Sequence, residues 1–249
     1  MSRDLSDVRA YYDRLAPRLV AVEGRNWHLQ SRMSLVLETI DGWARPGGRV
    51  LDVGCGTGFL LEQLAGRGFS GVGIDLSPES IAHARERLEA LGAADRLDAR
   101  LGSAYEPPEG EYDLITVTDV LEHLEDPRRC LRALRERLAP AGLVVVSTPN
   151  RRSLPGARRW LAEHGVPGIN LSLAPIDRWQ SWTDLESHGA AAGLVPVSRR
   201  GIFFRPGGRV GSQLGRLYRL ERVRSAELAL SRTAVGRYGF YVCLGFRPA

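Results

Sequence analysis

The sequence predicts an α/β fold: a seven-stranded, mostly parallel β-sheet with an antiparallel last strand and helices on both faces. Five apolar, strand-like segments between residues 50 and 147 alternate with segments of helical periodicity. This alternation requires a parallel sheet with right-handed crossovers. A glycine-rich loop at residues 54–58 follows the first strand, as in many α/β ligand sites. Two more strands follow residue 193, and no standard crossover helix precedes the last one.

Length and composition limit the domain organisation. The chain has 249 residues, 43% of them hydrophobic, so it can bury the core of one α/β domain with insertions. We therefore expect a single domain over residues 1–249. Its parts are a helical cap at 1–44, a ligand-binding core at 45–150, a lid at 151–182 and the rest of the sheet at 183–249.

Charge and cysteine content argue against several classes of protein. The net charge is +5, and all 34 basic residues are arginine. A modest positive charge is compatible with an acidic partner but does not by itself indicate nucleic-acid binding. Three cysteines without a C-x-x-C spacing argue for a reducing compartment and against a structural zinc site. Because no apolar run reaches about 18 residues, we expect no membrane span and a cytoplasmic location.

Residues 5–40 have the periodicity of two helices, with a polar break at 23–26. Tyr11 and Tyr12 belong to the apolar pattern of the first helix. This pair of helices could cover a cofactor site, with Tyr12 against it. The alternative is that both tyrosines are packing residues.

The first strand, residues 50–53, runs directly into the glycine loop. Glycine has no Cβ, so backbone N–H groups of the loop can approach a ligand closely. Asp75 ends the second strand, 17 positions beyond Gly58. An acidic side chain there can accept hydrogen bonds from ribose hydroxyls, because ligands of open α/β sheets bind at the carboxyl ends of strands. The alternative is a polar residue that only precedes the helix capped by Ser77.

A group of polar side chains follows the fourth strand. The third, fourth and fifth strands are expected at 97–101, 112–118 and 143–147, with a helix from Asp126-Pro127 before the fifth. Asp119, Glu122 and His123 come at the carboxyl end of the fourth strand. Positions i, i+3 and i+4 share one face of a helix, so we expect these side chains to lie together.

The alternating pattern stops between residues 151 and 182. This stretch contains Trp160, Trp179 and Trp182. A long irregular connection is usually a functional lid or a disordered segment, and three tryptophans disfavour disorder. We therefore expect a substrate lid. The remaining elements are expected as a helix at 184–193, strands at 194–204 and 239–246, and an arginine-rich helical insertion at 210–233.

Four pieces of the sequence resemble one family. They are Leu51-Asp52-Val53-Gly54-Cys55-Gly56-Thr57-Gly58, Ile74-Asp75-Leu76-Ser77, Tyr112-Asp113 and Asp119-Val120-Leu121-Glu122-His123-Leu124. In this order and at these intervals they are similar to the class I S-adenosylmethionine-dependent methyltransferases, which have a Rossmann-like fold. The resemblance is strongest to the branch of ubiquinone-biosynthesis O-methyltransferases and small-molecule natural-product methyltransferases. It covers residues 45–150 well, the last 60 by strand order only, and 151–182 hardly at all.

The resemblance implies S-adenosyl-L-methionine as the cofactor and a role for each matching residue. The methionine part would be held by Asp52, Gly54, Cys55, Gly56 and Gly58. Asp75 would bind both ribose hydroxyls, Leu76 the adenine face, and the backbone of Thr118 and Asp119 the other side. Many relatives have aspartate at the position of Ser103, so the Ser103 hydroxyl or the Ala104 backbone would contact the adenine amino group here.

The same resemblance leaves alternatives for Asp119, Glu122 and His123. Two carboxylates and an imidazole suit a general base beside the transferred methyl group. In the quinone-precursor enzymes a comparable cluster is associated with a divalent cation that binds and deprotonates a catechol. Glu-His also occurs in relatives that bind no metal. For His123 the alternatives are a base or a polar contact to substrate, or a structural role. We expect these three as catalytic residues and keep the divalent metal as an alternative.

Three functional classes follow. The leading prediction is a methyltransferase that acts on a small-molecule acceptor, such as a phenol, quinol, sugar or amine, by in-line displacement. The aromatic lid favours it, because it can form a closed apolar pocket. The second is an RNA methyltransferase that uses the arginines of the C-terminal region, and the third is a cofactor-binding protein without catalysis.

Overall fold

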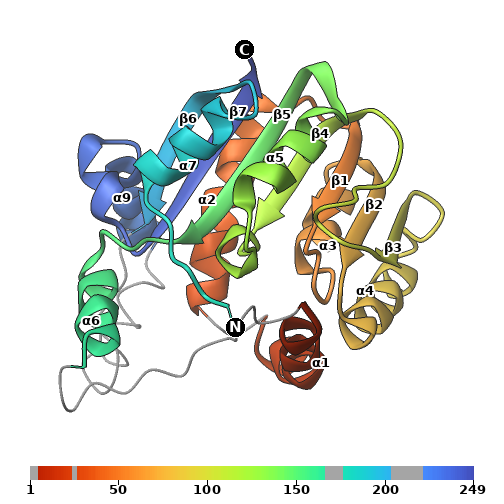
Figure 1. The fold of residues 1–249 in the computed structure, drawn as a ribbon. Helices are drawn as coiled ribbons and strands as arrows, with labels where there is room; N and C mark the ends of the chain where they lie inside the picture. Colours follow the sequence, from red (N-terminus) through yellow and green to blue (C-terminus); the bar gives the residue numbers. More distant parts are fainter. Residues whose placement is uncertain (1–4, 24–26, 166–175, 203–220) are drawn as a thin grey trace.

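Seven strands form one mixed sheet at the centre of the fold (Figure 1). This computed structural model describes residues 5–23, 27–165, 176–202 and 221–249. The strand order is β3-β2-β1-β4-β5-β7-β6; β7 is antiparallel to both neighbours, and the other pairs are parallel. The predicted sheet and its antiparallel last strand are therefore confirmed. The strands are β1 (Arg49–Val53), β2 (Ser70–Asp75), β3 (Leu97–Leu101), β4 (Tyr112–Thr118), β5 (Leu138–Pro149), β6 (Leu194–Ile202) and β7 (Tyr241–Pro248).

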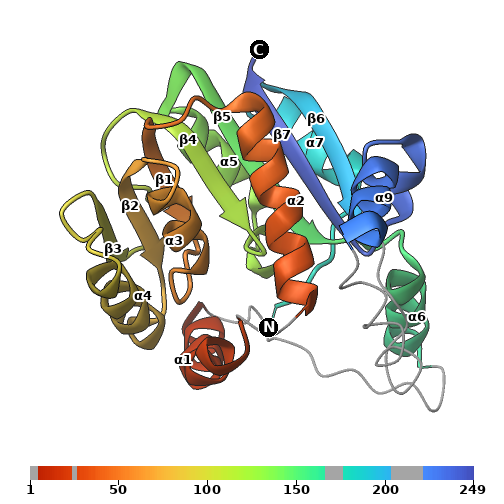
Figure 2. The ribbon, with the colours of Figure 1, turned by 180° about the vertical axis from the view of Figure 1, so that it is seen from behind.

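Helices cover both faces of the sheet. Helices α2, α3 and α4 pack on one face and α5 and α7 on the other, as Figures 1 and 2 show from opposite sides. The described helices are α1 (Leu5–Val22), α2 (Trp27–Trp43), α3 (Phe59–Ala65), α4 (Pro78–Ala90), α5 (Pro127–Arg135), α6 (Leu154–Glu163), α7 (Trp182–Ala190) and α9 (Glu221–Ser231), with 3-10 turns η1 (Leu121–His123) and η2 (Ala234–Tyr238).

The central strands are apolar because both of their faces are covered. Leu114, Ile115 and Val117 of β4 are fully buried, and successive side chains of a strand face opposite helix layers. Asp52 of β1 and Thr116 of β4 are the polar exceptions. They are register partners in neighbouring strands, so the sheet itself places the hydroxyl against the carboxylate.

Side-chain caps determine where two of the helices begin. Ser77 accepts a hydrogen bond from the Ser80 N–H at the start of α4, and Asp126 accepts one from the Arg129 N–H at the start of α5. In both helices a proline follows the cap, where its missing N–H costs no helical hydrogen bond. Both starts agree with the sequence prediction, and both lie just after polar residues at the carboxyl edge of the sheet.

Helix α1 lies beyond the carboxyl ends of β1, β2 and β4 rather than on either face of the sheet (Figures 1 and 2). It contacts α4. The break before α2 occurs after Glu23, as the sequence predicts. Of the two helices expected as an N-terminal cap, α1 lies across the edge of the sheet where ligands of this fold class bind, whereas α2 packs mainly on one face of the sheet.

Several details differ from the sequence prediction. Residues 119–124 form no α-helix, because Asp119 has a left-handed backbone (φ 55°) and only the three-residue turn η1 follows. Strand β5 begins at Leu138, five residues before the start expected at residue 143. The predicted lid contains α6, and part of the arginine-rich insertion, residues 210–220, lies outside the described residues. Within the described ranges, no helix combines the length and apolar character that a membrane span requires.

Because β7 is buried, we expect Leu244→Ala to lower the free energy of unfolding by about 2–5 kcal/mol. Leu244 is 0% exposed between β5 and β6, so the truncated side chain leaves a cavity that the packed layers cannot close. Urea denaturation followed by circular dichroism measures the change. The matched control is Val195→Ala on β6, where the side chain is 44% exposed and a change below about 1 kcal/mol is expected. Equal losses in the two variants would contradict the assigned layer structure.

Candidate functional site

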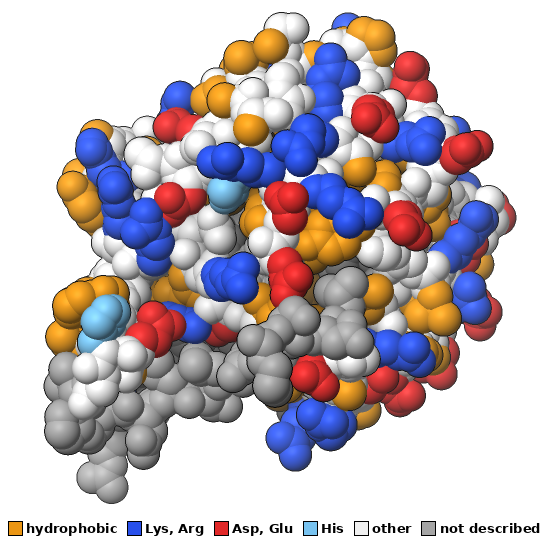
Figure 3. All heavy atoms as spheres, viewed as in Figure 1, with side chains coloured by type: hydrophobic (Ala, Val, Ile, Leu, Met, Phe, Trp, Pro, Cys, Tyr) orange, Lys and Arg blue, Asp and Glu red, His pale blue; other side chains and the backbone are white. Residues whose placement is uncertain are grey.

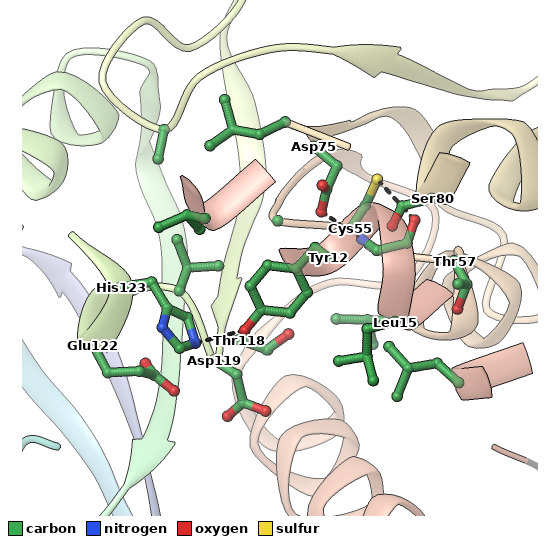
Figure 4. Close-up of a pocket in the computed structure, with 18 of the residues that line it drawn as sticks. Tyr12, Leu15, Cys55, Thr57, Asp75, Ser80, Thr118, Asp119, Glu122 and His123 are labelled. Carbon is green, nitrogen blue, oxygen red and sulfur yellow. Dashed lines mark hydrogen bonds between the residues drawn. The ribbon is translucent and has the colours of Figure 1, made fainter. Parts of the chain in front are cut away.

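A cavity of about 430 Å³ lies between α1 and the carboxyl ends of β1, β2 and β4. Figure 4 shows Tyr12 in the middle of it, with Asp75 and Cys55 on one side and Glu122 and His123 on the other. All but one of the residues predicted to bind cofactor line the cavity: Tyr12, Asp52, Gly54, Cys55, Gly56, Asp75, Leu76, Ser103, Ala104, Thr118 and Asp119. We call the two ends the loop end, at the glycine loop, and the acceptor end, at Glu122.

The three glycines of the loop have different tasks. All have positive φ angles: 70° at Gly54, 52° at Gly56 and 80° at Gly58. A Cβ on Gly54 would collide with Val120, and one on Gly58 would lie 3.0 Å from the Ala84 Cα of α4. A Cβ on Gly56 would meet nothing within 4 Å. Gly58, the residue absent from the cavity wall, thus allows α4 to approach the loop, and Gly56 faces open space.

Asp75 fastens the glycine loop to the end of β2. Its Oδ2 accepts a hydrogen bond from the Gly56 N–H at 2.9 Å, and its Oδ1 accepts one from the Ser77 N–H at 2.9 Å. Burial raises the pKa of Asp75, although these backbone hydrogen bonds oppose the shift. A carboxylate has about four lone-pair sites, so each oxygen can still accept a further hydrogen bond from a ligand.

Asp52 contributes a second buried carboxylate at the loop end. It is 1% exposed, and its Oδ1 accepts a hydrogen bond from the Thr116 Oγ1 at 2.7 Å. Its Oδ2 has no hydrogen-bond partner among the described residues. Burial raises the pKa of Asp52 to about 7, and the nearby Asp75 adds to the rise. Such an unpaired buried acceptor is costly unless a ligand supplies a donor.

Ser103 and Ala104 lie where the chain leaves β3. The Ser103 Oγ accepts a hydrogen bond from the Tyr105 N–H at 3.2 Å, which leaves its own hydroxyl hydrogen free to donate. The Tyr105 hydroxyl in turn accepts the Asp126 N–H at 3.0 Å. Two groups could replace the aspartate that many relatives have at this position, the Ser103 hydroxyl and the Ala104 backbone. Both lie at the cavity wall.

Polar contacts hold α1 against the loop end. Glu23 accepts hydrogen bonds from the Thr57 hydroxyl, within the glycine loop, and from Arg87 of α4. Near the middle of the helix, the Ser77 hydroxyl donates to Asp13 at 2.6 Å. This role of Glu23 could not be predicted from the sequence, because nothing local distinguishes it from any other acidic residue that follows a helix.

Asp119 marks the border between the two ends of the cavity. Its carboxylate forms a salt bridge with Arg32 of α2. Arg32 also donates a hydrogen bond to the Tyr241 hydroxyl at 3.1 Å, and its guanidinium lies over the Tyr241 ring at 5.2 Å. Burial raises the pKa of Asp119, and the charge of Arg32 opposes this. Asp119 was predicted from the sequence, whereas Arg32 and its own partner Tyr241 were not, because they come from distant segments.

His123 has both ring nitrogens engaged. Its Nδ1 lies 2.5 Å from the Ile176 carbonyl oxygen, which can only accept, so Nδ1 must be the nitrogen that carries the hydrogen. In the neutral ring Nε2 is then an acceptor, and it lies 2.7 Å from the Tyr12 hydroxyl (Figure 4). Burial raises the pKa of Tyr12 well above its ordinary value, which keeps that hydroxyl protonated and able to donate.

Glu122 is 1% exposed at the acceptor end. The Thr148 side chain offers its carboxylate a hydrogen bond, but Oε2 has no partner among the described residues. Burial raises the pKa of Glu122 well above its ordinary value, and Asp119 adds to this. In the described part of the chain, no three His, Cys, Asp or Glu side chains are arranged as a metal site. The three residues thus differ in their contacts instead of sharing one helix face as expected.

Aromatic side chains complete the acceptor end. Trp179, Phe240 and Tyr241 line it. Their rings pack edge to face, with centroids 5.2 Å apart between Trp179 and Phe240 and 5.1 Å apart between Phe240 and Tyr241. Of the three tryptophans in the predicted lid, only Trp179 reaches the cavity. Trp160 is 56% exposed on α6, and Trp182 packs against the core of the sheet.

Comparisons with known proteins identify related sequences. The family model described as "Methyltransferase domain" matches residues 26–198. A ubiquinone biosynthesis O-methyltransferase of Idiomarina loihiensis is 31% identical over 168 residues, 64% of this chain and 67% of that protein. Its namesake in Xanthomonas campestris pv. campestris is 43% identical over 112 residues, 43% of this chain and 46% of that protein. The second match thus spans less than half of the relative.

A solved structure agrees in fold. Magnesium protoporphyrin IX methyltransferase of Synechocystis PCC 6803, with bound SAH, superposes with a TM-score of 0.67. The superposition covers 99% of this chain and 100% of that chain at 17% sequence identity. At this identity the likeness shows the fold alone.

The pKa of Asp52 predicts a pH dependence of stability. Because the pKa is raised from 3.8 to about 7 on folding, the protonated carboxyl stabilises the folded state at low pH, and this contribution is lost as the pH rises through 7. The unfolding free energy of the wild type should therefore fall relative to Asp52→Asn by about 2 kcal/mol between pH 5 and pH 8. Urea denaturation across this range measures it. The stability of Asp95→Asn, a control at an exposed position, should change with pH as that of the wild type does. If the stability of Asp52→Asn also followed the wild type across this pH range, the raised pKa of Asp52 would be contradicted.

Proposed function

The chain belongs to the class I S-adenosylmethionine-dependent methyltransferases, and we propose that it transfers the methyl group to a small-molecule acceptor bound in the same cavity. One observation carries the proposal. A single cavity joins the glycine loop and Asp75 at one end to a carboxylate and aromatic pocket at the other. Both substrates of a methyl transfer could therefore meet in it, in line and away from water.

The loop end fits the cofactor. Asp75 lies at the end of β2 with lone pairs for two ribose hydroxyls, and Leu76 beside it offers an apolar side for adenine. The unpartnered Asp52 Oδ2 suits the ammonium group of the methionine part. Gly56 leaves room above the loop that a side chain would occupy. When bound, S-adenosylmethionine supplies a methyl group on a sulfonium, which a nucleophile displaces directly.

The protein's part in such a reaction is to position, to enclose and to remove a proton. Tyr12, Leu15 and Leu19 of α1 line the cavity and cover part of it. The contacts of Glu23 with Thr57 and Arg87 hold this cover in place. Charge interactions beneath the cover are stronger than in bulk water, because less water screens them.

His123 is the proposed proton acceptor. With Nδ1–H fixed on the Ile176 carbonyl, its Nε2 lone pair points to the Tyr12 hydroxyl. An acceptor hydroxyl that took the place of the Tyr12 hydroxyl would donate to the same lone pair and could transfer its proton there as the methyl group arrives. Asp119, paired with Arg32, would then position the backbone beside the cofactor, and Glu122 would contact the acceptor.

The surface offers less support for an RNA substrate. On the face seen in Figure 3, arginines are interspersed with acidic side chains. Electrostatic binding of a nucleic acid favours a clustered basic surface. An acceptor bound beneath α1 must fit a cavity of about 430 Å³, which favours a small molecule.

Asp75→Ala should weaken binding of the demethylated cofactor, S-adenosylhomocysteine, by about 10- to 100-fold, because two hydrogen bonds to a charged acceptor are lost. Isothermal titration calorimetry measures the dissociation constant. Asp95→Ala, which alters an exposed side chain, should bind as the wild type does. Unchanged affinity in Asp75→Ala would refute the placement of the ribose.

His123→Ala should reduce turnover by about 100- to 10,000-fold while the affinity for S-adenosylhomocysteine stays within about twofold of the wild type. The assay follows methyl transfer to the best acceptor from a screen of phenols and amines. His164→Ala is the matched control, because His164 is exposed and stacked on Trp160. Normal turnover in His123→Ala would remove His123 from the mechanism.

A further inference from the structure

The acceptor end contains more buried negative charge than its arginines neutralise. Asp119, Glu122 and Asp177 all line it. Arg32 forms a salt bridge with Asp119, and Arg159 forms one with Asp177, whose Oδ1 also accepts the Trp179 Nε1–H at 2.9 Å. Two of the three carboxylates are thus paired within the protein. No such salt bridge to Glu122 occurs among the described residues.

The Glu122 side chain differs from the other two in this missing counter-charge. Asp119 also has an oxygen, Oδ1, without a hydrogen-bond partner among the described residues, but its carboxylate is paired with Arg32. Glu122 has neither a counter-charge nor a partner for one of its oxygens. It is 1% exposed, and its Oε2 has no hydrogen-bond partner in the described part of the chain. Burying a carboxylate without a donor or a counter-charge costs several kcal/mol, so such groups are rare unless they serve a ligand. Figure 4 shows this carboxylate directed toward the space beside His123 and Asp119, inside the cavity.

Aromatic rings line the same cavity. Tyr12, Trp179, Phe240 and Tyr241 line the acceptor end. The faces of aromatic rings attract cations, and cages of such rings beside a carboxylate recognise organic ammonium groups. The protein already uses two of these rings in this way, because Arg32 lies 5.2 Å from the Tyr241 centroid and Arg159 lies 5.1 Å from the Trp179 centroid.

We infer that the methyl acceptor carries an ammonium group, which binds the Glu122 carboxylate within the ring of Tyr12, Trp179, Phe240 and Tyr241. The inference rests on the proposed function and specifies the substrate class of the same cavity. An ammonium supplies a hydrogen-bond donor for Oε2 and a counter-charge for the carboxylate. An aromatic or aliphatic frame of the acceptor would pack against the rings.

The recognised ammonium is not the atom that is methylated. A protonated amine has no lone pair, so it cannot displace the sulfonium. The acceptor therefore has a second, uncharged nucleophile, a hydroxyl or a neutral amine, placed toward the Tyr12 hydroxyl and His123. Glu122 acts as a specificity-determining residue, and His123 handles the proton.

The test compares two probes of nearly the same shape, benzylamine and benzyl alcohol, at pH 7 on protein saturated with S-adenosylhomocysteine. Ligand-observed NMR titration gives both dissociation constants. We expect benzylamine to bind about 10-fold more tightly than benzyl alcohol, the gain typical of a charge-assisted hydrogen bond. Glu122→Gln keeps the shape and removes the charge, so this preference should fall to near parity. Glu125→Gln, an exposed neighbour outside the cavity wall, should keep it.

The inference is overturned if benzyl alcohol binds as tightly as benzylamine, if neither binds, or if Glu122→Gln retains the preference. Competition of Mg²⁺ with benzylamine at Glu122 would also overturn it, because the carboxylate would then serve a metal. Binding of S-adenosylhomocysteine to each variant shows that it has folded. It also separates the two levels of the proposal, because failure of the wild type to bind S-adenosylhomocysteine contradicts the proposed function itself.

Discussion

The hydrogen bonds from Gly56 and Ser77 to Asp75 are the interaction on which the rest of the site depends. They join the loop after β1 to the turn after β2, so the two strand ends form one rigid floor. The backbone N–H groups of Gly54 and Cys55 both donate to the Ile74 carbonyl oxygen, which closes the same joint. The loop needs positive φ angles to make these contacts, and glycine provides them without steric cost.

Helix α1 covers this floor on one side, so the cavity lies between the helix and the strand ends. Most helical stability in proteins comes from tertiary packing, and α1 contains Pro17, so contacts with the rest of the protein must hold it. Those contacts are concentrated on the glycine loop and α4, through Glu23, Thr57 and Arg87. The cover is therefore fastened to the glycine loop itself. Tyr12 connects it to His123 at the acceptor end.

The sequence predicted the loop end well and the acceptor end poorly, for a physical reason. Glycines after a strand, and an acid at the next strand's end, are local patterns that α/β geometry brings together. Arg32, Phe240 and Tyr241 reach the acceptor end through sheet order and helix packing, which leave no local signal. The helix expected at Asp119 was wrong because that residue adopts a left-handed backbone, a tertiary effect. The domain boundaries and the catalytic roles stay predictions.

A crystal structure of the protein with S-adenosylhomocysteine tests the central claim most directly. We expect both ribose hydroxyls on the Asp75 carboxylate, the ligand's ammonium on the Asp52 Oδ2, and the sulfur directed past Tyr12 to the acceptor end. A ligand ordered elsewhere, or lying in the cavity without contact to Asp75, would contradict the assignment of this cavity to methyl transfer.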